Sequence, residues 1–150
     1  MSLKQQIDND IRSAMLGKRK EELEALRSIK SMILLAETDK GGSGELTNDA
    51  EMKILMKAAK QRKESADIFL QQSRQDLADK ELFQMEVIGR YLPKQLSEEE
   101  LTEEIKKLIS ETGAKGPQDM GKVMGAATKA FAGRADGKLI SEIVKKLLTA

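Results

Sequence analysis

Two glycines and two lysines within residues 117–137 are the residues of this chain whose types and spacing suggest binding chemistry. Read as a helix, this segment has an apolar stripe on one side (Met120, Val123, Met124, Ala127 and Phe131). The opposite side is called the Gly–Lys face below, and it holds Gly121, Lys122, Gly125 and Lys129. A glycine inside a helix costs about 1 kcal/mol relative to alanine, and glycines that point away from the core do not improve its packing. The pattern therefore indicates that a negatively charged group approaches the helix backbone there.

The residues around this face add to its positive charge. From Lys115 to Ala150 the chain holds seven basic and three acidic residues, although its overall net charge is only +1. A local positive charge of this kind favours phosphate groups. Phe131 belongs to the apolar stripe, so contacts to phosphates are expected rather than stacking on bases. We predict that these residues bind nucleic acid: Gly121, Lys122, Gly125, Lys129, Arg134 and Lys138.

Two other interpretations of the Gly–Lys face remain open. The two glycines have the Gly-x-x-x-Gly spacing, so the face could be a groove that packs another helix of the same chain. Alternatively, the groove could accept the helix of a partner protein, with no RNA involved. Salt dependence separates binding to phosphates from apolar docking, because only the former weakens steeply as salt rises.

Two further charged positions suggest structural roles. Arg62 lies at the edge of a predicted apolar face, and an arginine there usually pairs with a carboxylate of a neighbouring helix. Asp76 and Glu81 are the candidate partners. Asp136 directly precedes the last predicted helix, so it is expected to be the N-cap of that helix.

The composition argues against catalysis. The chain contains no histidine and no cysteine, which removes the commonest general base, the thiolate nucleophile and the commonest metal ligands. It also lacks a Gly-rich phosphate loop followed by Lys-Ser/Thr, and a Gly-x-Ser-x-Gly elbow. We therefore expect no catalytic residue, no metal site and no cofactor.

The sequence also gives an expected location. No run of about 18 apolar residues is present, so no membrane partner is expected. The first residues lack the apolar core of a signal peptide, and Asp8 and Asp10 argue against a transit peptide. These features favour a cytoplasmic protein, and no DNA partner is expected.

Strong helix formers dominate the chain and only two prolines occur, so the expected fold is all-α. Apolar spacing and capping residues, among them Ser2, Ser97 and Gly113, predict four helices before Pro93 and three after it, with a flexible loop at residues 41–44. The second of the three later helices is expected to begin at Pro117 and to end at Gly133. Pro93 disfavours helical geometry at the residue before it. We therefore predict a helical N-terminal domain, residues 1–93, and a compact three-helix C-terminal domain, residues 94–150.

Five motifs then carry a family resemblance: KQRKES at 60–65, RQDLADKE at 74–81, YLPKQLSEEEL at 91–101, DMGKVMG at 119–125 and GRADGKLI at 133–140. Through them the chain resembles the YqeY-like family nearly from end to end. The C-terminal domain of that family is shared with the tail of the GatB chain of the aspartyl/glutamyl-tRNA amidotransferase. The resemblance implies an all-α fold with a larger helical N-terminal domain and a three-helix C-terminal domain.

The resemblance also carries functional expectations. In the amidotransferase this tail contacts tRNA, while glutamine hydrolysis and amide transfer occur on other domains and other chains of the enzyme. The implied partner is therefore tRNA, or a complex of a tRNA amidotransferase or synthetase, and the expected role is that of a non-catalytic accessory protein. Two alternatives remain: a component of a carbon–nitrogen ligase reaction with glutamine as the amido-nitrogen donor, and a helix-groove module that binds proteins without RNA.

Overall fold

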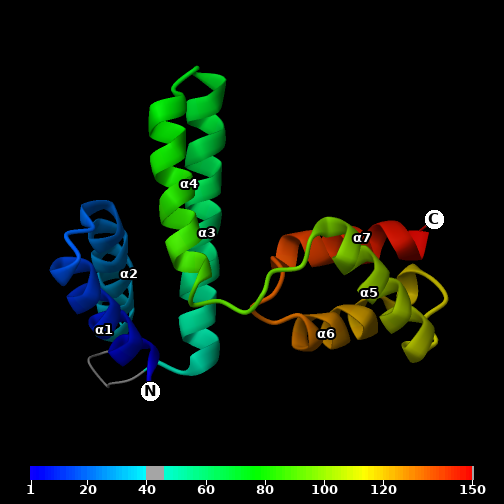
Figure 1. Cartoon of the computed structure of the whole chain (residues 1–150). Helices are drawn as coiled ribbons and strands as arrows, with labels where there is room; N and C mark the ends of the chain where they lie inside the picture. The colour runs from blue at the N-terminus through cyan, green and yellow to red at the C-terminus, as the bar shows by residue number, and fades with distance from the viewer. Residues whose placement is uncertain (40–45, 150) are drawn as a thin grey trace. The chain divides into compact units, whose positions relative to one another are not determined.

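The structure is a computed structural model that describes residues 1–39 and 46–149 (Figure 1). Its first four helices are α1 (Leu3–Leu16), α2 (Lys20–Asp39), α3 (Asn48–Gln71) and α4 (Gln75–Gly89). They are followed by α5 (Glu98–Thr112), the short 3-10 helix η1 (Pro117–Asp119), α6 (Met120–Ala130) and α7 (Gly137–Thr149). Since the described residues form helices and no strand, the all-α prediction is confirmed. The loop predicted at residues 41–44 lies outside the described residues.

The helices begin and end at residues that satisfy their free backbone groups. The hydroxyl of Ser2 accepts a hydrogen bond from the backbone N–H of Gln5, whose side chain accepts one from the N–H of Ser2. Ser97 caps α5 in a similar way by accepting from the N–H of Glu100 at 3.1 Å. Gly113 ends α5 in the left-handed conformation, with φ of +72°. These caps are the ones that the sequence predicts, because short hydroxyl side chains and glycine suit these positions.

One predicted helix is shorter than expected. The prediction begins a helix at Pro117 and ends it at Gly133, but α6 runs only from Met120 to Ala130, after the 3-10 turn. Gly133 lies in the connection that follows and has φ of +75°. That left-handed conformation suits glycine and marks the end of the turn that leaves α6.

The chain divides into two compact units, Met1–Pro93 and Lys94–Ala150. In the first unit α1 and α2 pair with each other, α3 and α4 form a second pair, and α2 packs against both α3 and α4. Figure 1 shows α1 and α2 on one side of the α3–α4 hairpin. The residues buried at the centre of this unit include Ile7, Leu26, Ile29, Ile33, Leu55, Val87 and Ile88.

Polar contacts hold the end of α4 against α1 and α2. The Arg90 guanidinium donates to Glu22 at 2.7 Å, and Arg19 donates to the same carboxylate at 2.6 Å. The hydrogen bonds from Arg19 and Arg90 lower the pKa of Glu22 below its usual value. The hydroxyl of Tyr91 donates to Asp10, and burial together with this hydrogen bond raises the pKa of Tyr91. The last residues before the domain boundary are therefore fixed within the first unit.

The second unit has a core of its own. Its three α-helices contact one another, and residues from all of them are buried together (Leu101, Ile105, Val123, Ala127, Phe131, Ile140, Ile143, Val144 and Leu148). Leu96 belongs to this unit, since it packs against this core and its N–H donates to the backbone oxygen of Arg134 at 2.9 Å. A separate core is the physical requirement for a domain that folds alone.

We predict that residues 94–150 fold without the rest of the chain. The expected result is a cooperative thermal transition of the helical circular dichroism signal, at a stability of only a few kcal/mol because the fragment is small. A gradual, non-cooperative decline of the signal would contradict the domain boundary. Residues 1–93 expressed alone provide the matching measurement for the first unit.

We also predict that Val123→Ala lowers the free energy of unfolding of the second unit by about 1–4 kcal/mol, because the Val123 side chain is fully buried. Thr128→Ala on the exposed side of the same helix is the control and should change stability by less than about 0.5 kcal/mol. Chemical denaturation of the C-terminal fragment and of the full chain measures both. Equal effects of the two substitutions would contradict the orientation of α6 in which Val123 faces the core and Thr128 faces solvent.

Candidate nucleic-acid interface

The packing of α6 determines which of its residues face solvent. Val123 and Ala127 are fully buried, and Phe131 is 4% exposed just after the helix. The opposite side is exposed along the whole helix, and it holds Gly121, Lys122, Gly125 and Lys129. The burial of the stripe therefore turns the Gly–Lys face outward.

The surface at the two glycines is open. A Cβ atom added at Gly121 or at Gly125 would have no described atom within 4 Å, apart from those of its own helix turn and chain neighbours. The groove that packs another helix of the same chain is therefore not formed in the described structure. A ligand that reaches this face would meet backbone rather than side chains at both glycines.

Lys122 is not a free surface charge. Its ammonium group donates a hydrogen bond to the backbone oxygen of Thr112 at 3.0 Å, at the C-terminal end of α5. The last carbonyls of a helix lack partners within the helix, and a cation near them is favourable by about 0.3–1 kcal/mol. Lys122 therefore helps to join α6 to α5. The sequence gives no sign of this contact, because it depends on how the two helices pack.

The other three cations make no ion pair or side-chain hydrogen bond with any residue that the structure describes. Lys129 lies in the last turn of α6, and Lys138 lies in the first turn of α7. Arg134 lies between them and is half-buried. A lysine in the first turn of a helix is unfavourable, because that end of the helix dipole is positive. The N-terminal end of α7 thus adds to the positive charge of Lys138, whereas Lys129 lies at the C-terminal end of α6, where the helix dipole is negative.

The backbone of this connection is held in place. The side-chain amide of Gln95 donates to the backbone oxygen of Gly133 at 2.6 Å, beside the contact between Leu96 and Arg134. Asp136 occupies the predicted N-cap position, since α7 begins at the next residue and the Asp136 carbonyl accepts from the N–H of Ile140 at 3.0 Å. The segment that carries Arg134 is thus anchored at several points.

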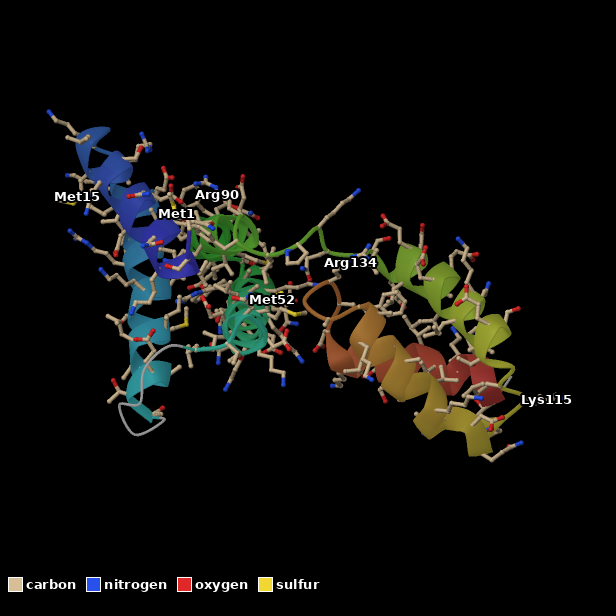
Figure 2. The ribbon with its side chains drawn as sticks, turned by 90° about the horizontal axis from the view of Figure 1, so that it is seen from below. Met1, Met15, Met52, Arg90, Lys115 and Arg134 are labelled. Carbon is tan, nitrogen blue, oxygen red and sulfur yellow. The ribbon has the colours of Figure 1, made fainter. Side chains whose placement is uncertain are left out.

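The basic residues are spread over the length of the unit. Figure 2 shows Lys115 and Arg134 at opposite ends of it. The helix between them has 11 residues and is about 16 Å long. This arrangement suits a ligand that carries several negative charges along its length better than one with a single charged group.

The α5 side of the same unit has the opposite charge. Its exposed carboxylates are those of Glu98, Glu99, Glu100, Glu103, Glu104 and Glu111. Lys106 and Lys107 pair with Glu103 and Glu104, at 3.3 Å and 3.8 Å. An anionic ligand would therefore be repelled from α5 and attracted to α6 and α7.

The predicted structural role of Arg62 is supported. Its guanidinium donates to Glu81 at 3.3 Å, one of the two carboxylates expected, and to the hydroxyl of Ser28 at 3.3 Å. It thus connects α3, α4 and α2. The lysines of the same stretch of α3 are exposed (Lys53, Lys57, Lys60 and Lys63).

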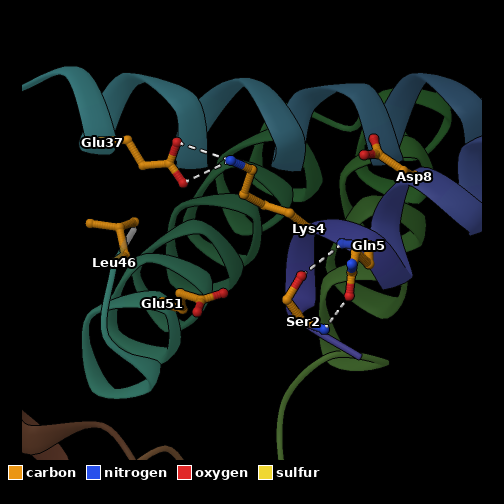
Figure 3. Close-up of a pocket in the computed structure, with 7 residues that line it drawn as sticks. All are labelled: Ser2, Lys4, Gln5, Asp8, Glu37, Leu46 and Glu51. Carbon is orange, nitrogen blue, oxygen red and sulfur yellow. Dashed lines mark hydrogen bonds and ion pairs between the residues drawn. The ribbon is translucent and has the colours of Figure 1, made fainter. Parts of the chain in front are cut away.

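A pocket in the first unit offers polar groups but no evident chemistry (Figure 3). Ser2, Lys4, Gln5, Asp8, Glu37, Leu46 and Glu51 line it. Ser2 and Gln5 form the cap of α1, Lys4 pairs with Glu37 at 3.2 Å, and Asp8 pairs with Lys30 at 2.6 Å. These contacts fix the cap of α1 and join α1 to α2, so they give the polar groups of α1 and α2 in this pocket a structural role.

Metal-binding clusters and membrane-spanning helices are both absent from the described part of the chain. Within residues 1–39 and 46–149, no group of three or more acidic residues is placed to hold a metal ion. In the same residues no helix is both long and apolar enough to cross a membrane.

Known proteins with similar sequences support the resemblance. The family model described as Yqey-like protein matches residues 4–148. "Altered inheritance of mitochondria protein 41, mitochondrial" of Clavispora lusitaniae is 36% identical over 107 residues, which cover 70% of this chain and 61% of that protein. The protein of the same name from Pyrenophora tritici-repentis is 29% identical over 145 residues, covering 94% of this chain and 78% of that protein. The matched part of this chain thus spans less than two thirds of the length of the first relative. The family model covers almost all residues of this chain, so the chain belongs to the YqeY-like protein family.

Proposed function

We propose that this protein is a non-catalytic accessory protein that binds tRNA through its C-terminal unit. The proposed interface is the Gly–Lys face of α6 together with Arg134 and Lys138. The setting would be a complex that handles tRNA, such as a tRNA amidotransferase or synthetase. A cytoplasmic location is part of the proposal, whereas the two fungal relatives are named as mitochondrial proteins. Both compartments contain tRNA.

One observation carries this proposal: an open strip of helix backbone lies beside cations that have no carboxylate partner among the described residues. Phosphates of a nucleic acid backbone bind lysine and arginine, and the release of their counterions drives the association. Any residue with a Cβ atom in place of Gly121 or Gly125 would hold a sugar–phosphate backbone farther from the helix. The two glycines and the cations beside them therefore suit the same ligand.

The exposed apolar side chains argue against docking of an apolar partner helix on this face. A helix that lies in a groove is held by apolar anchors. The large hydrophobic residues that are exposed in the described structure all precede Pro93, and the second unit contributes none of them. The resemblance to the tRNA-contacting tail of the amidotransferase points in the same direction.

We predict that Lys129→Glu combined with Lys138→Glu weakens tRNA binding, because two phosphates lose their contact with a cation. The slope of the logarithm of the binding constant against the logarithm of the salt concentration should become shallower by about two units. Lys122 is left unchanged because it stabilises the end of α5. The matched control is Lys106→Glu with Lys107→Glu on α5, which changes the net charge equally but on the acidic side. The measurement is a tRNA titration of the three proteins at several salt concentrations, with melting curves to verify folding.

Two results would contradict this prediction. Wild-type protein that binds no tRNA at low salt would exclude the proposed function. An equal decrease of affinity in the two charge-reversed proteins would show that only net charge matters and that the α6–α7 surface is not the interface.

We further predict that Gly125→Leu weakens tRNA binding without lowering thermal stability. The added side chain would enter open space and would improve helix propensity by up to about 1 kcal/mol, yet it would obstruct a ligand that approaches the backbone. Titration and melting of the same protein measure both effects. Unchanged affinity in a folded Gly125→Leu protein would remove the glycines from the proposed interface.

A further inference from the structure

The first unit carries the exposed apolar side chains of the described structure, and two of them lie on one side of the α3–α4 hairpin. Leu70 on α3 is 44% exposed and Leu82 on α4 is 37% exposed. Side chains of this kind are usually buried, and a group of them marks an interaction surface more often than scattered single ones do. Their neighbours on the two helices therefore decide whether they form a surface.

The side chains on this side follow helical spacing on both helices. On α3 they recur at intervals of four and seven residues (Met52, Met56, Lys63 and Leu70). On α4 they recur at intervals of three and four residues (Leu82, Met85 and Gly89). Residues with this spacing share one face of a helix. Together they are called the outer hairpin face.

The outer hairpin face points away from α1 and α2. Ala58 of α3 and Val87 of α4 project from other sides of their helices and are buried in the core of the unit, which α1 and α2 also form. In Figure 2, Met52 projects from the side of α3 that is turned away from α1 and α2. Since these helices cover the inner side of the hairpin, the outer side has no described helix of this unit to cover it.

This face is incompletely packed. Met52, Met56 and Met85 are half-buried, and they are absent from the described side chains that pack against the core of the unit. A Cβ atom added at Gly89 would have no described atom within 4 Å beyond its own surroundings in the helix. Methionine side chains adapt their shape to a partner surface. The outer hairpin face is thus an apolar surface that can accept another one.

The charges at its edges indicate which partner fits. On the α3 side the face carries Lys63, and on the α4 side it is bordered by Asp79 and Glu86. A complementary surface must present carboxylates opposite α3 and lysines opposite α4. A second copy of the same hairpin, rotated about a two-fold axis parallel to the helices, presents that order. Its α4 lies over α3 of the first copy, which brings Lys63 towards Asp79 of the second copy.

The dimensions of the face also suit this arrangement. Met52 and Leu70 are 18 residues apart on α3, so the face is about 27 Å long and two helices wide. Two such hairpins stacked face to face make the cross-section of an antiparallel four-helix bundle. Most homo-oligomers are two-fold dimers in which the same patch of both copies meets.

We propose that this protein forms a two-fold symmetric dimer in which the outer hairpin faces of two copies pack into an antiparallel four-helix bundle. The dimer interface lies in the first unit only. Failure of the dimer proposal would therefore leave the proposal of tRNA binding by the second unit unaffected, and the reverse also holds.

The first test is sedimentation equilibrium of the full chain over a wide concentration series. The expected result is a reversible monomer–dimer equilibrium for the wild type, and a dimer dissociation constant raised at least roughly tenfold by Leu82→Glu. The matched control is Leu35→Glu, because Leu35 is 63% exposed on α2 and lies outside the outer hairpin face. It should dimerise as the wild type does. Melting curves of the monomeric variants verify that each is folded.

Three outcomes would overturn the proposal. The first is a wild type that sediments as a monomer at every concentration, which would leave a different protein as the occupant of this face. The second is a Leu82→Glu protein that dimerises as tightly as the wild type. The third is a Leu35→Glu protein whose dimer is weakened as strongly as that of Leu82→Glu, which would place the contact on the α1–α2 side.

A charge exchange tests the two-fold arrangement itself. Lys63→Glu alone should weaken the dimer, because it places two carboxylates opposite each other. Adding Asp79→Lys to the same chain should restore it, since both copies then carry the reversed pair. No ion pair joins Lys63 to Asp79 within one copy of the described structure, so restoration would report a contact between copies. A dimer weakened by Lys63→Glu and not restored in the double variant would contradict the two-fold arrangement.

Discussion

The burial of Val123 and Ala127 is the constraint on which the candidate interface depends. A helix with one buried stripe can rotate about its axis only by exposing part of that stripe to water, and a fully buried aliphatic side chain contributes about 1.5–3 kcal/mol. In a unit as small as this one, that is a large share of the total stability. The rotation of α6 is thereby fixed, and the outward direction of Gly121, Gly125 and Lys129 follows from it.

Much of this arrangement follows from local features of the sequence. The apolar stripe of α6, the caps at Ser2, Ser97 and Gly113, and the break at Pro93 are local features, each set by residues within a few positions of one another. The exposed face of α6 and the caps of α1 and α5 could therefore be predicted from the sequence. Both ends of α6 differ from the prediction, because Pro117–Asp119 form a 3-10 turn and the helix ends before Gly133. The pairing of Arg62 with a carboxylate could be predicted in kind, since a charge at the edge of a buried face needs a partner.

Contacts between distant segments could not be predicted in this way. The hydrogen bond from Tyr91 to Asp10 joins residues that are 81 positions apart, and the one from Arg90 to Glu22 spans 68. Both depend on how α4 meets α1 and α2. The contact of Lys122 with Thr112 has the same origin, and it changes the interpretation of the candidate site. One of the two lysines on the Gly–Lys face supports α5, so the charge available to a ligand comes mainly from Lys129, Arg134 and Lys138.

The two glycines of α6 are the part of the site that the fold itself does not require. Gly121 and Gly125 lie within a regular helix, neither is among the glycines with positive φ, and an alanine at either position would meet open space. Replacing both with alanine would therefore favour the helix by about 2 kcal/mol without a steric penalty. A feature that weakens a small domain and serves nothing within it is best explained by a contact with another molecule. Because cations border both glycines and no large apolar side chain is exposed in the described part of this unit, a phosphate backbone fits that contact better than a protein helix does.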